Sequence, residues 1–157
     1  MLMVPVAAAG FAALLFLLRL TVSVLLVSGP SMTPALRHGQ RVLFVRRGLV
    51  RPRVGRIVVL RPPPGPAGRP LLVKRVVALA GDPVPPEVRE ATGAAPDAVV
   101  PPGRLMVLGD NPPFSTDSRL WGALPVSDVV GVVLEGTRLR GAAAGPGLRG
   151  RGCGGRG

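Results

Sequence analysis

The sequence predicts a mostly β protein, in which a single N-terminal transmembrane helix precedes a compact all-β domain of coiled antiparallel sheets. Residues 2–27 are almost entirely apolar. Short runs rich in Val, Leu and Ile follow, bounded by Gly or Pro. The 157 residues include 22 Gly and 19 Pro, which favours turns and short strands over long helices. We therefore expect an anchor at 2–27, one domain at 28–140, and a disordered Gly/Arg-rich tail at 141–157.

The apolar segment 2–27 is long enough to cross a bilayer as a helix, which takes about 20 residues. Arg19 interrupts it, at a cost of roughly 2.5–3.5 kcal/mol, which the Leu, Phe and Val around it can offset. The segment is too long for a cleaved signal peptide, and no basic region precedes it. A buried core helix is the alternative. Because basic residues follow the segment closely, the positive-inside rule places the domain in the cytoplasm.

Five runs downstream have the composition of β-strands, with Pro-rich segments between some of them. Residues 62–70 are expected to form a loop, and the Pro- and Ala-rich residues 83–103 an excursion from the sheet. The predicted strands are 41–46, 56–61, 71–79, 104–108 and 129–135.

Composition excludes several classes of protein. The chain has one cysteine, Cys153, in the tail, and one histidine, His38, so neither an internal disulfide nor a zinc site is expected. The net charge of +12 suits nucleic acid or an anionic membrane surface. The arginines are spread along the chain without interleaved aromatic residues, so we expect no nucleic-acid binding.

Among twenty basic residues there is one lysine, Lys74. A guanidinium stays protonated in proteins, whereas a buried amine can lose its proton and act as a general base. Ser31 lies 43 residues upstream, and a serine activated by a lysine is a known nucleophile–base arrangement. The alternatives are a chance survivor of Lys-to-Arg drift and a Ser-His-Asp triad through His38.

A third polar segment completes a pattern of three boxes in order, which read SGPSMTPAL (28–36), VKRVVALAGD (73–82) and GDNPPFSTDSRLWGALP (109–125). With the hydrophobic segment before them, these boxes resemble the type I signal peptidases, which are membrane-bound serine proteases with a Ser/Lys dyad. The resemblance covers roughly residues 20–135, and the three boxes together are highly specific.

The resemblance implies a role for each matching residue. Ser31 would be the nucleophile, and its backbone N–H an oxyanion donor. Lys74 would be the general base, with a pKa lowered by its apolar surroundings. Ser115 would orient the lysine amine. The remaining charged residues would support the site through two ion pairs, Asp110 with Arg75 and Asp117 with Arg119.

Three features of the sequence depart from the family pattern. Gly29 stands where some relatives have a serine that donates to the oxyanion, and Ser28 is out of register with it. Gln40 replaces a usual Asp, which is expected to weaken a local hydrogen bond. Residues 112–114 are apolar where relatives are commonly charged. Met32, after the nucleophile, is expected to pack beneath it or to touch lipid.

The resemblance implies removal of signal peptides from exported preproteins with small residues near the cleavage site, at the bilayer surface and without metal or cofactor. It places the catalytic domain outside the cytoplasm, against the charge bias, and we favour the motifs. One alternative is a dedicated maturation protease of the same superfamily, for example for nickel-type superoxide dismutase. Self-cleaving LexA-type repressors share the dyad but need a DNA-binding domain. From another class, a non-catalytic basic membrane-anchored binding protein remains.

Overall fold

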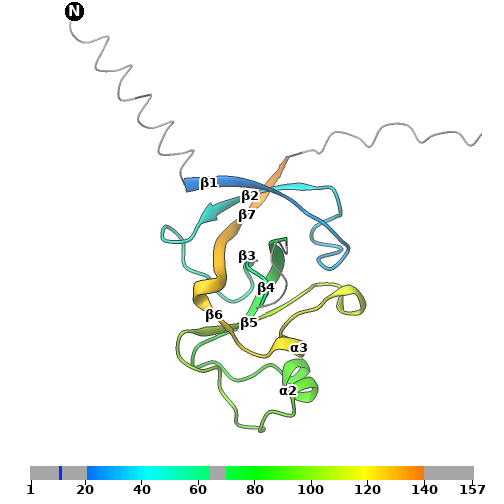
Figure 1. Ribbon diagram of the computed structural model, residues 1–157, viewed down its shortest axis with the longest axis vertical. Coiled ribbons are helices and arrows are strands. Elements are labelled where there is room, and N and C mark those ends of the chain that lie inside the picture. Colours follow the sequence, from blue (N-terminus) through cyan, green and yellow to red (C-terminus); the bar gives the residue numbers. More distant parts are fainter. Residues whose placement is uncertain (1–10, 12–20, 64–69, 140–157) are drawn as a thin grey trace, which may run out of the picture.

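A computed structural model describes residue 11, residues 21–63 and residues 70–139, which form one antiparallel sheet with short helices (Figure 1). The sheet has seven strands in the order β1-β2-β7-β3-β4-β5-β6. The strands are β1 (Val22–Leu26), β2 (Arg41–Arg46), β3 (Ile57–Leu60), β4 (Leu72–Leu79), β5 (Arg104–Leu108), β6 (Leu124–Pro125) and β7 (Val129–Leu139). The helices are α2 (Pro86–Thr92) and α3 (Ser118–Trp121), with 3-10 turns at Pro112–Phe114 and Val126–Asp128.

The predicted mostly β fold is confirmed. The strands form a single coiled antiparallel sheet, whereas we expected more than one sheet. The register shifts between β2 and β7, between β3 and β7, and between β4 and β5. Such irregularities bend the strands and increase their twist, which lets one sheet curve around its own core. All four residues of β3 are buried, as expected for the most central of the short strands.

All five predicted strand runs contain strands, but the end of the predicted anchor does not fit a helix. Val22–Leu26, within the predicted segment 2–27, form β1 and pair with β2. Most of that segment lies outside the described residues, as does the predicted tail 141–157. Among the residues that are described, no helix is long and apolar enough to span a bilayer.

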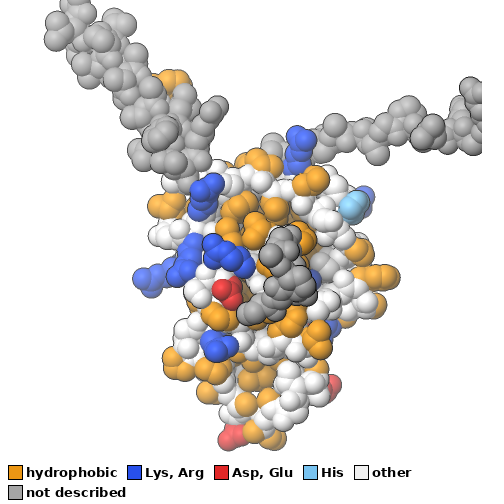
Figure 2. Space-filling view, viewed as in Figure 1, with side chains coloured by type: hydrophobic (Ala, Val, Ile, Leu, Met, Phe, Trp, Pro, Cys, Tyr) orange, Lys and Arg blue, Asp and Glu red, His pale blue; other side chains and the backbone are white. Residues whose placement is uncertain are grey.

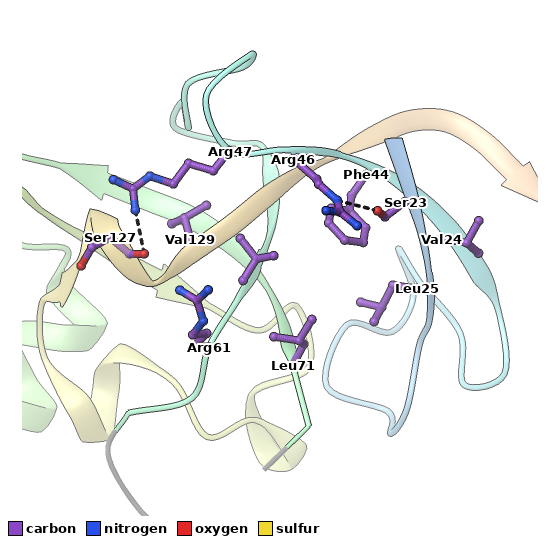
Figure 3. A pocket seen from close by; sticks show the side chains of 11 residues that line it. Ser23, Val24, Leu25, Phe44, Arg46, Arg47, Arg61, Leu71, Ser127 and Val129 are labelled. Atoms are coloured by element: carbon purple, nitrogen blue, oxygen red, sulfur yellow. Dashed lines mark hydrogen bonds between the residues drawn. The ribbon is translucent and has the colours of Figure 1, made fainter. Parts of the chain in front are cut away.

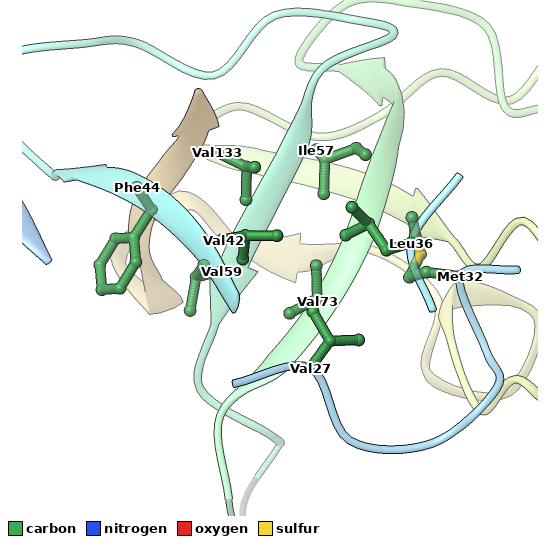
Figure 4. Close-up of a cluster of buried hydrophobic side chains, with 9 residues drawn as sticks. All are labelled: Val27, Met32, Leu36, Val42, Phe44, Ile57, Val59, Val73 and Val133. Carbon is green, nitrogen blue, oxygen red and sulfur yellow. The ribbon is translucent and has the colours of Figure 1, made fainter. Parts of the chain in front are cut away.

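The loop between β1 and β2 is fixed to the sheet by apolar side chains. Val27, Met32 and Leu36 of this loop are buried in the main core cluster (Figure 4). They pack against side chains of four strands, which are Val42, Phe44, Ile57, Val59, Val73 and Val133. Met32 is 1% exposed, so it belongs to the protein core and makes no lipid contact of the kind we considered. The core thereby sets the position of Ser31, the residue before Met32.

The excursion between β4 and β5 carries its own small core. It contains α2, which begins with Pro86 in its first turn and ends at Gly93, whose φ of 67° closes the helix in a left-handed conformation. Val88 of α2 packs with Ala78 and Met106 of the sheet in a third cluster. Figure 1 places α2 beside α3, and the two helices are in contact. The excursion therefore supports the sheet from the end opposite β1.

Candidate active site

Lys74 lies in the middle of β4 with its side chain buried. It is 3% exposed, and its backbone is paired with Val58 of β3. Burial lowers the pKa of this amine, since the charged form loses its hydration. The negative charge of Asp117 partly offsets this effect, and the positive charge of Arg119 adds to it. The net result is an amine that gives up its proton more easily than an exposed lysine.

A chain of hydrogen bonds runs from Lys74 to a carboxylate through Ser115. The Nζ of Lys74 donates to Ser115 Oγ at 2.8 Å, and Ser115 Oγ donates to Asp117 Oδ2 at 2.6 Å. An ionised carboxylate can only accept, so the hydroxyl proton of Ser115 points to Asp117. The hydroxyl oxygen is then left to accept from Lys74. Asp117 thereby fixes the direction of the bond that holds the amine.

Asp117 is itself held by five hydrogen bonds. It is 1% exposed, and besides Ser115 it accepts from Gly109 N at 2.9 Å and from Arg119 through N, Nε and Nη2 at 3.2, 3.0 and 2.6 Å. Burial alone raises the pKa of this carboxyl, but these hydrogen bonds outweigh burial and the pKa is lowered. The carboxylate is therefore charged and also caps the N-terminus of α3.

Both ion pairs expected around the site are present. The Asp117–Arg119 pair is the one described above, and the second joins Arg75 to Asp110 through two bonds of 2.8 and 2.6 Å. Arg75 also donates to Gly55 O at 2.7 Å. This second pair ties the end of β5 to β4 and to the turn before β3.

The backbone around Ser31 is hydrogen-bonded to the residues of the third box that follow β5. Asn111 N donates to Ser31 O at 3.0 Å, and Asn111 Nδ2 donates to Pro30 O at 3.1 Å. Gly109 has no room for a side chain, because a Cβ there would lie 2.7 Å from Ser31 O and would also clash with Ser115 Oγ. Ser31, Gly109 and Ser115 are therefore in close contact. The sequence boxes did not single out Asn111 or Gly109 for this role, because their contacts are made by the backbone or by an absent side chain.

Neither the hydroxyl nor the backbone N–H of Ser31 is used by the fold. Within the described part of the chain, neither group forms a hydrogen bond. Ser31 is half-buried, although Met32 after it is fully buried. Ser31 thus has a hydroxyl and a backbone N–H that are available to a substrate, while the burial of Met32 fixes the backbone beside it.

His38 contacts the serine loop at a point other than the hydroxyl. The Gly29 N–H donates to His38 Nδ1 at 3.0 Å, and Gly29 has a φ of 87°. His38 makes no hydrogen bond to Ser31 or to a carboxylate among the described residues, which disfavours a triad through it. Gln40 Oε1 accepts from Arg37 N at 3.0 Å, so this position keeps a local hydrogen bond despite the missing Asp.

No group of three or more metal-ligating side chains occurs in the described ranges. What the fold brings together is a serine with a free hydroxyl, a buried amine, a second serine and a charged carboxylate. A nucleophile and a base of lowered pKa are the requirements for covalent catalysis of acyl transfer.

Comparison with known proteins identifies a family for this chain. A family model described as signal peptidase, peptidase S26, matches residues 1–91 and 85–135. The chain is 32% identical over 67% of its length to thylakoidal processing peptidase 1 of Arabidopsis thaliana, and 36% identical over 68% to mitochondrial ATP-independent inner membrane protease subunit 1b of the same plant. It is 30% identical over 69% to probable signal peptidase I-1 of Synechocystis.

These alignments cover 38%, 64% and 67% of the three relatives, so the chain spans only part of the length of the first two. The matched residues include all three sequence boxes and the strands that carry them. The chain belongs to the signal peptidase family, peptidase S26.

Proposed function

We propose that this chain is a membrane-bound serine endopeptidase that removes signal peptides from exported preproteins, with Ser31 as nucleophile and Lys74 as general base. The observation that carries the proposal is the state of Lys74. Its amine is buried, its pKa is lowered, and it is hydrogen-bonded to a neutral hydroxyl instead of a carboxylate. A structural lysine at such a depth normally has a directly contacting carboxylate, because an unpaired buried charge is costly.

The reaction proceeds in two steps through a covalent intermediate. Neutral Lys74 takes the proton of the Ser31 hydroxyl as Ser31 Oγ attacks the scissile carbonyl carbon. The oxyanion that forms accepts a hydrogen bond from the free N–H of Ser31. Protonated Lys74 then gives its proton to the leaving amine, and the C–N bond breaks. In the second step a water molecule loses a proton to Lys74 and attacks the acyl carbon. Lys74 then returns this proton to Ser31 Oγ as the ester C–O bond breaks, and the released acid ionises to the new carboxylate.

Asp117 and Ser115 position the base in this scheme. With the Ser115 hydroxyl directed to Asp117, one N–H of Lys74 is used in the bond to Ser115. A neutral amine has two N–H groups and one lone pair, so fixing one N–H restricts where the lone pair points. Ser115 therefore acts as the lysine-orienting residue, and Asp117, Arg119, Asp110 and Arg75 act as its support.

Two open strand edges favour an extended substrate. Within the described part of the chain, β1 pairs with β2 on one side only. Residues Leu72 to Lys74 of β4 pair there with β3 but not with β5, whose ladder begins at Arg75. A preprotein segment added as a strand along these edges would present alternate side chains to shallow pockets. This arrangement suits cleavage sites with small residues at alternate positions.

The apolar residues before β1 are the proposed membrane anchor. Since Val22–Leu26 belong to the sheet, the anchor is shortened from 2–27 to about 2–20. Such a segment is close to the length needed to span, about 17–25 residues. We place the catalytic domain on the extracytoplasmic side, where cleavage sites emerge. Two relatives carry membrane locations in their names, the mitochondrial inner membrane and the thylakoid.

Cleavage of a model preprotein with an Ala-x-Ala site, by the full chain in detergent, tests the proposal. Wild type is compared with Ser31→Ala and Lys74→Arg, and with Arg53→Lys as a matched control on the exposed surface. We expect cleavage by wild type and control, and a loss of at least about 1,000-fold in the two site variants. Thermal melting shows that each variant is folded.

Two outcomes would contradict parts of this scheme. Appreciable cleavage by Lys74→Arg rules out the lysine as base, because a guanidinium supplies no neutral amine. Absence of cleavage by folded wild type rules out general signal-peptide removal and leaves a dedicated substrate or a non-catalytic role. Retention of the chain in membranes washed at alkaline pH tests the anchor independently of activity.

A further inference from the structure

A groove of about 590 Å³ lies on the sheet, and none of the residues given for its lining belongs to the three boxes. It is formed by β1, the end of β2, the start of β7 and the residues that leave β3 and enter β4 (Figure 3). This volume is within the range of sites that bind small organic ligands, about 300–1,000 Å³. The lining residues are Ser23, Val24, Leu25, Phe44, Arg46, Arg47, Arg61, Leu71, Ser127, Val129 and Val130.

Three arginines line this groove, and part of their donor capacity is unused. Arg46 Nε donates to Ser23 Oγ at 3.0 Å, and Arg47 Nη1 donates to Ser127 O at 2.8 Å, which holds both guanidinium groups in place (Figure 3). All three side chains are exposed, and within the described residues none forms an ion pair. Each guanidinium has five N–H donors, so several remain for a ligand. Pairs of such donors match the oxygens of a phosphate.

The charge around the groove is positive overall. Among the described residues, no acidic residue lines the groove. Asp128 lies in the chain between the lining residues Ser127 and Val129, and its backbone carbonyl accepts from Arg61 N at 2.9 Å. One carboxylate against three guanidinium groups leaves a net positive site. Figure 2 shows several basic side chains gathered beside an apolar area on this face, with one acidic side chain next to them. An anionic ligand is favoured there.

The remainder of the groove is apolar and open to solvent. Val24 is 55% exposed and Leu71 is 38% exposed, and Leu25 and Phe44 lie deeper beside them. In Figure 3 Arg47 and Arg61 lie on one side of the groove and Val24 and Leu25 on the other, with Arg46 between them beside Phe44 and Ser23. A ligand that fills the whole groove therefore combines a phosphate with an apolar chain. Phospholipids have this combination, and free phosphate has only the first part.

The position of the groove in the chain favours a lipid of the bilayer. β1, which supplies three lining residues, begins immediately after the apolar segment 2–20 that we take as the anchor. A strand that leaves the bilayer at this point brings the groove to the level of the lipid headgroups, where basic residues are attracted to anionic lipids. We propose that the groove binds one anionic phospholipid, with its phosphate on Arg46, Arg47 and Arg61 and an acyl chain along Val24 and Leu71. This inference rests on the proposed anchoring of the chain.

The test measures lipid binding by the full chain in detergent, using thermal shifts and native mass spectrometry with dioctanoyl phosphatidylglycerol. We expect a saturable rise in melting temperature and one retained lipid, with neither effect for dioctanoyl phosphatidylcholine. The variant Arg46→Gln/Arg47→Gln/Arg61→Gln is expected to bind at least tenfold more weakly. The control Arg37→Gln/Arg51→Gln/Arg53→Gln has the same loss of charge at exposed positions outside the groove, and is expected to bind like wild type.

Four results would overturn the proposal. Equal loss of binding in the control variant means that net charge alone attracts the lipid. An equal effect of inorganic phosphate means that the site takes a free anion. A raised KM for the model preprotein with unchanged lipid binding assigns the groove to the substrate. If the triple variant does not fold, the single variant Arg61→Gln takes its place, because the Arg61 side chain makes no intramolecular hydrogen bond among the described residues. Unchanged lipid binding in Arg61→Gln then contradicts the assignment.

The measurement is repeated on Ser31→Ala, so its result does not depend on catalysis. Binding by an inactive protein supports the lipid site even where the peptidase assignment fails. The anchor is tested separately: extraction of the chain from membranes at alkaline pH would contradict its assignment.

Discussion

Replacing Gly109 by alanine tests how closely the parts of the site are packed. Gly109 does not have a positive φ, so alanine introduces no backbone strain there and acts through its methyl group alone. That methyl group would lie 2.7 Å from Ser31 O and 2.6 Å from Ser115 Cβ, and would clash with Ser115 Oγ. An ordinary contact begins at 3.4 Å, so the serine loop must move by about 0.7 Å and Ser115 by at least about 0.8 Å.

The expected effect on catalysis follows from this displacement. A misplacement of about 1 Å at reacting groups costs on the order of 100-fold in rate. We expect kcat/KM for the model preprotein to fall by about 100-fold in Gly109→Ala. Overpacking of this kind also destabilises a protein by about 1–3 kcal/mol, which urea unfolding measures.

Gly131→Ala is the matched control, because a methyl group there meets the backbone of Val45 and lies 2.5 Å from the ring of Phe44. This clash is as severe, but it lies between β7 and β2, away from Lys74 and Ser115. We expect similar destabilisation with near-normal kcat/KM for the fraction that is folded. Equal losses of rate in the two folded variants, or a normal rate in Gly109→Ala, would refute the argument that Gly109 sets the distance between the serines.

Two further predictions concern the charged residues around the site. In Asp117→Asn we expect the pKa of Lys74 to fall further, because the carboxylate that raises it is gone. The acid limb of the pH–rate profile therefore moves to lower pH. The rate at the plateau falls, because the Ser115 hydroxyl loses its charged acceptor. A shift of that limb to higher pH contradicts this electrostatic account. Asp110→Asn, which weakens the partly exposed pair with Arg75, is expected to cost about 1 kcal/mol in urea unfolding and less than threefold in kcat/KM. A large loss of rate in a stable variant would mean that Asp110 does more than support the site.

Much of the sheet was predictable because its strands are short, β-branched and bounded by Gly or Pro. The run 104–108 coincides with β5 and 41–46 with β2, and the other three differ by a few residues at their ends. β1 was missed because Val22–Leu26 continue an apolar segment without a break, so composition alone does not separate strand from anchor. Helix α2 was missed because its residues occur in a Pro- and Ala-rich stretch that suggests a loop.

At the site, the sequence predicted which residues take part better than it predicted the contacts between them. The pairing of Lys74 with Ser115, and of Asp117 with Arg119, was expected and is present. The bond from Ser115 to Asp117 was not expected, although the two residues are separated only by Thr116. Sequence does not reveal which acceptor a hydroxyl selects. The place of β7 between β2 and β3 was also beyond prediction, because it depends on pairing between strands far apart in sequence.

The position of β7 between β2 and β3 determines when, during synthesis of the chain, the site can be assembled. In the sheet order, β1 and β2 carry the loop of Ser31, while β3 to β6 carry Lys74 and the third box, and the two groups are joined in the hydrogen-bonded ladder by β7. β7 is the last described strand to be synthesised. Until residues 129–139 leave the ribosome, the ladder that joins the strands beside Ser31 to those that carry Lys74 therefore cannot form. With Ser31 and Lys74 as the proposed nucleophile and base, we expect this order of assembly to delay proteolytic activity until synthesis of the folded domain is complete.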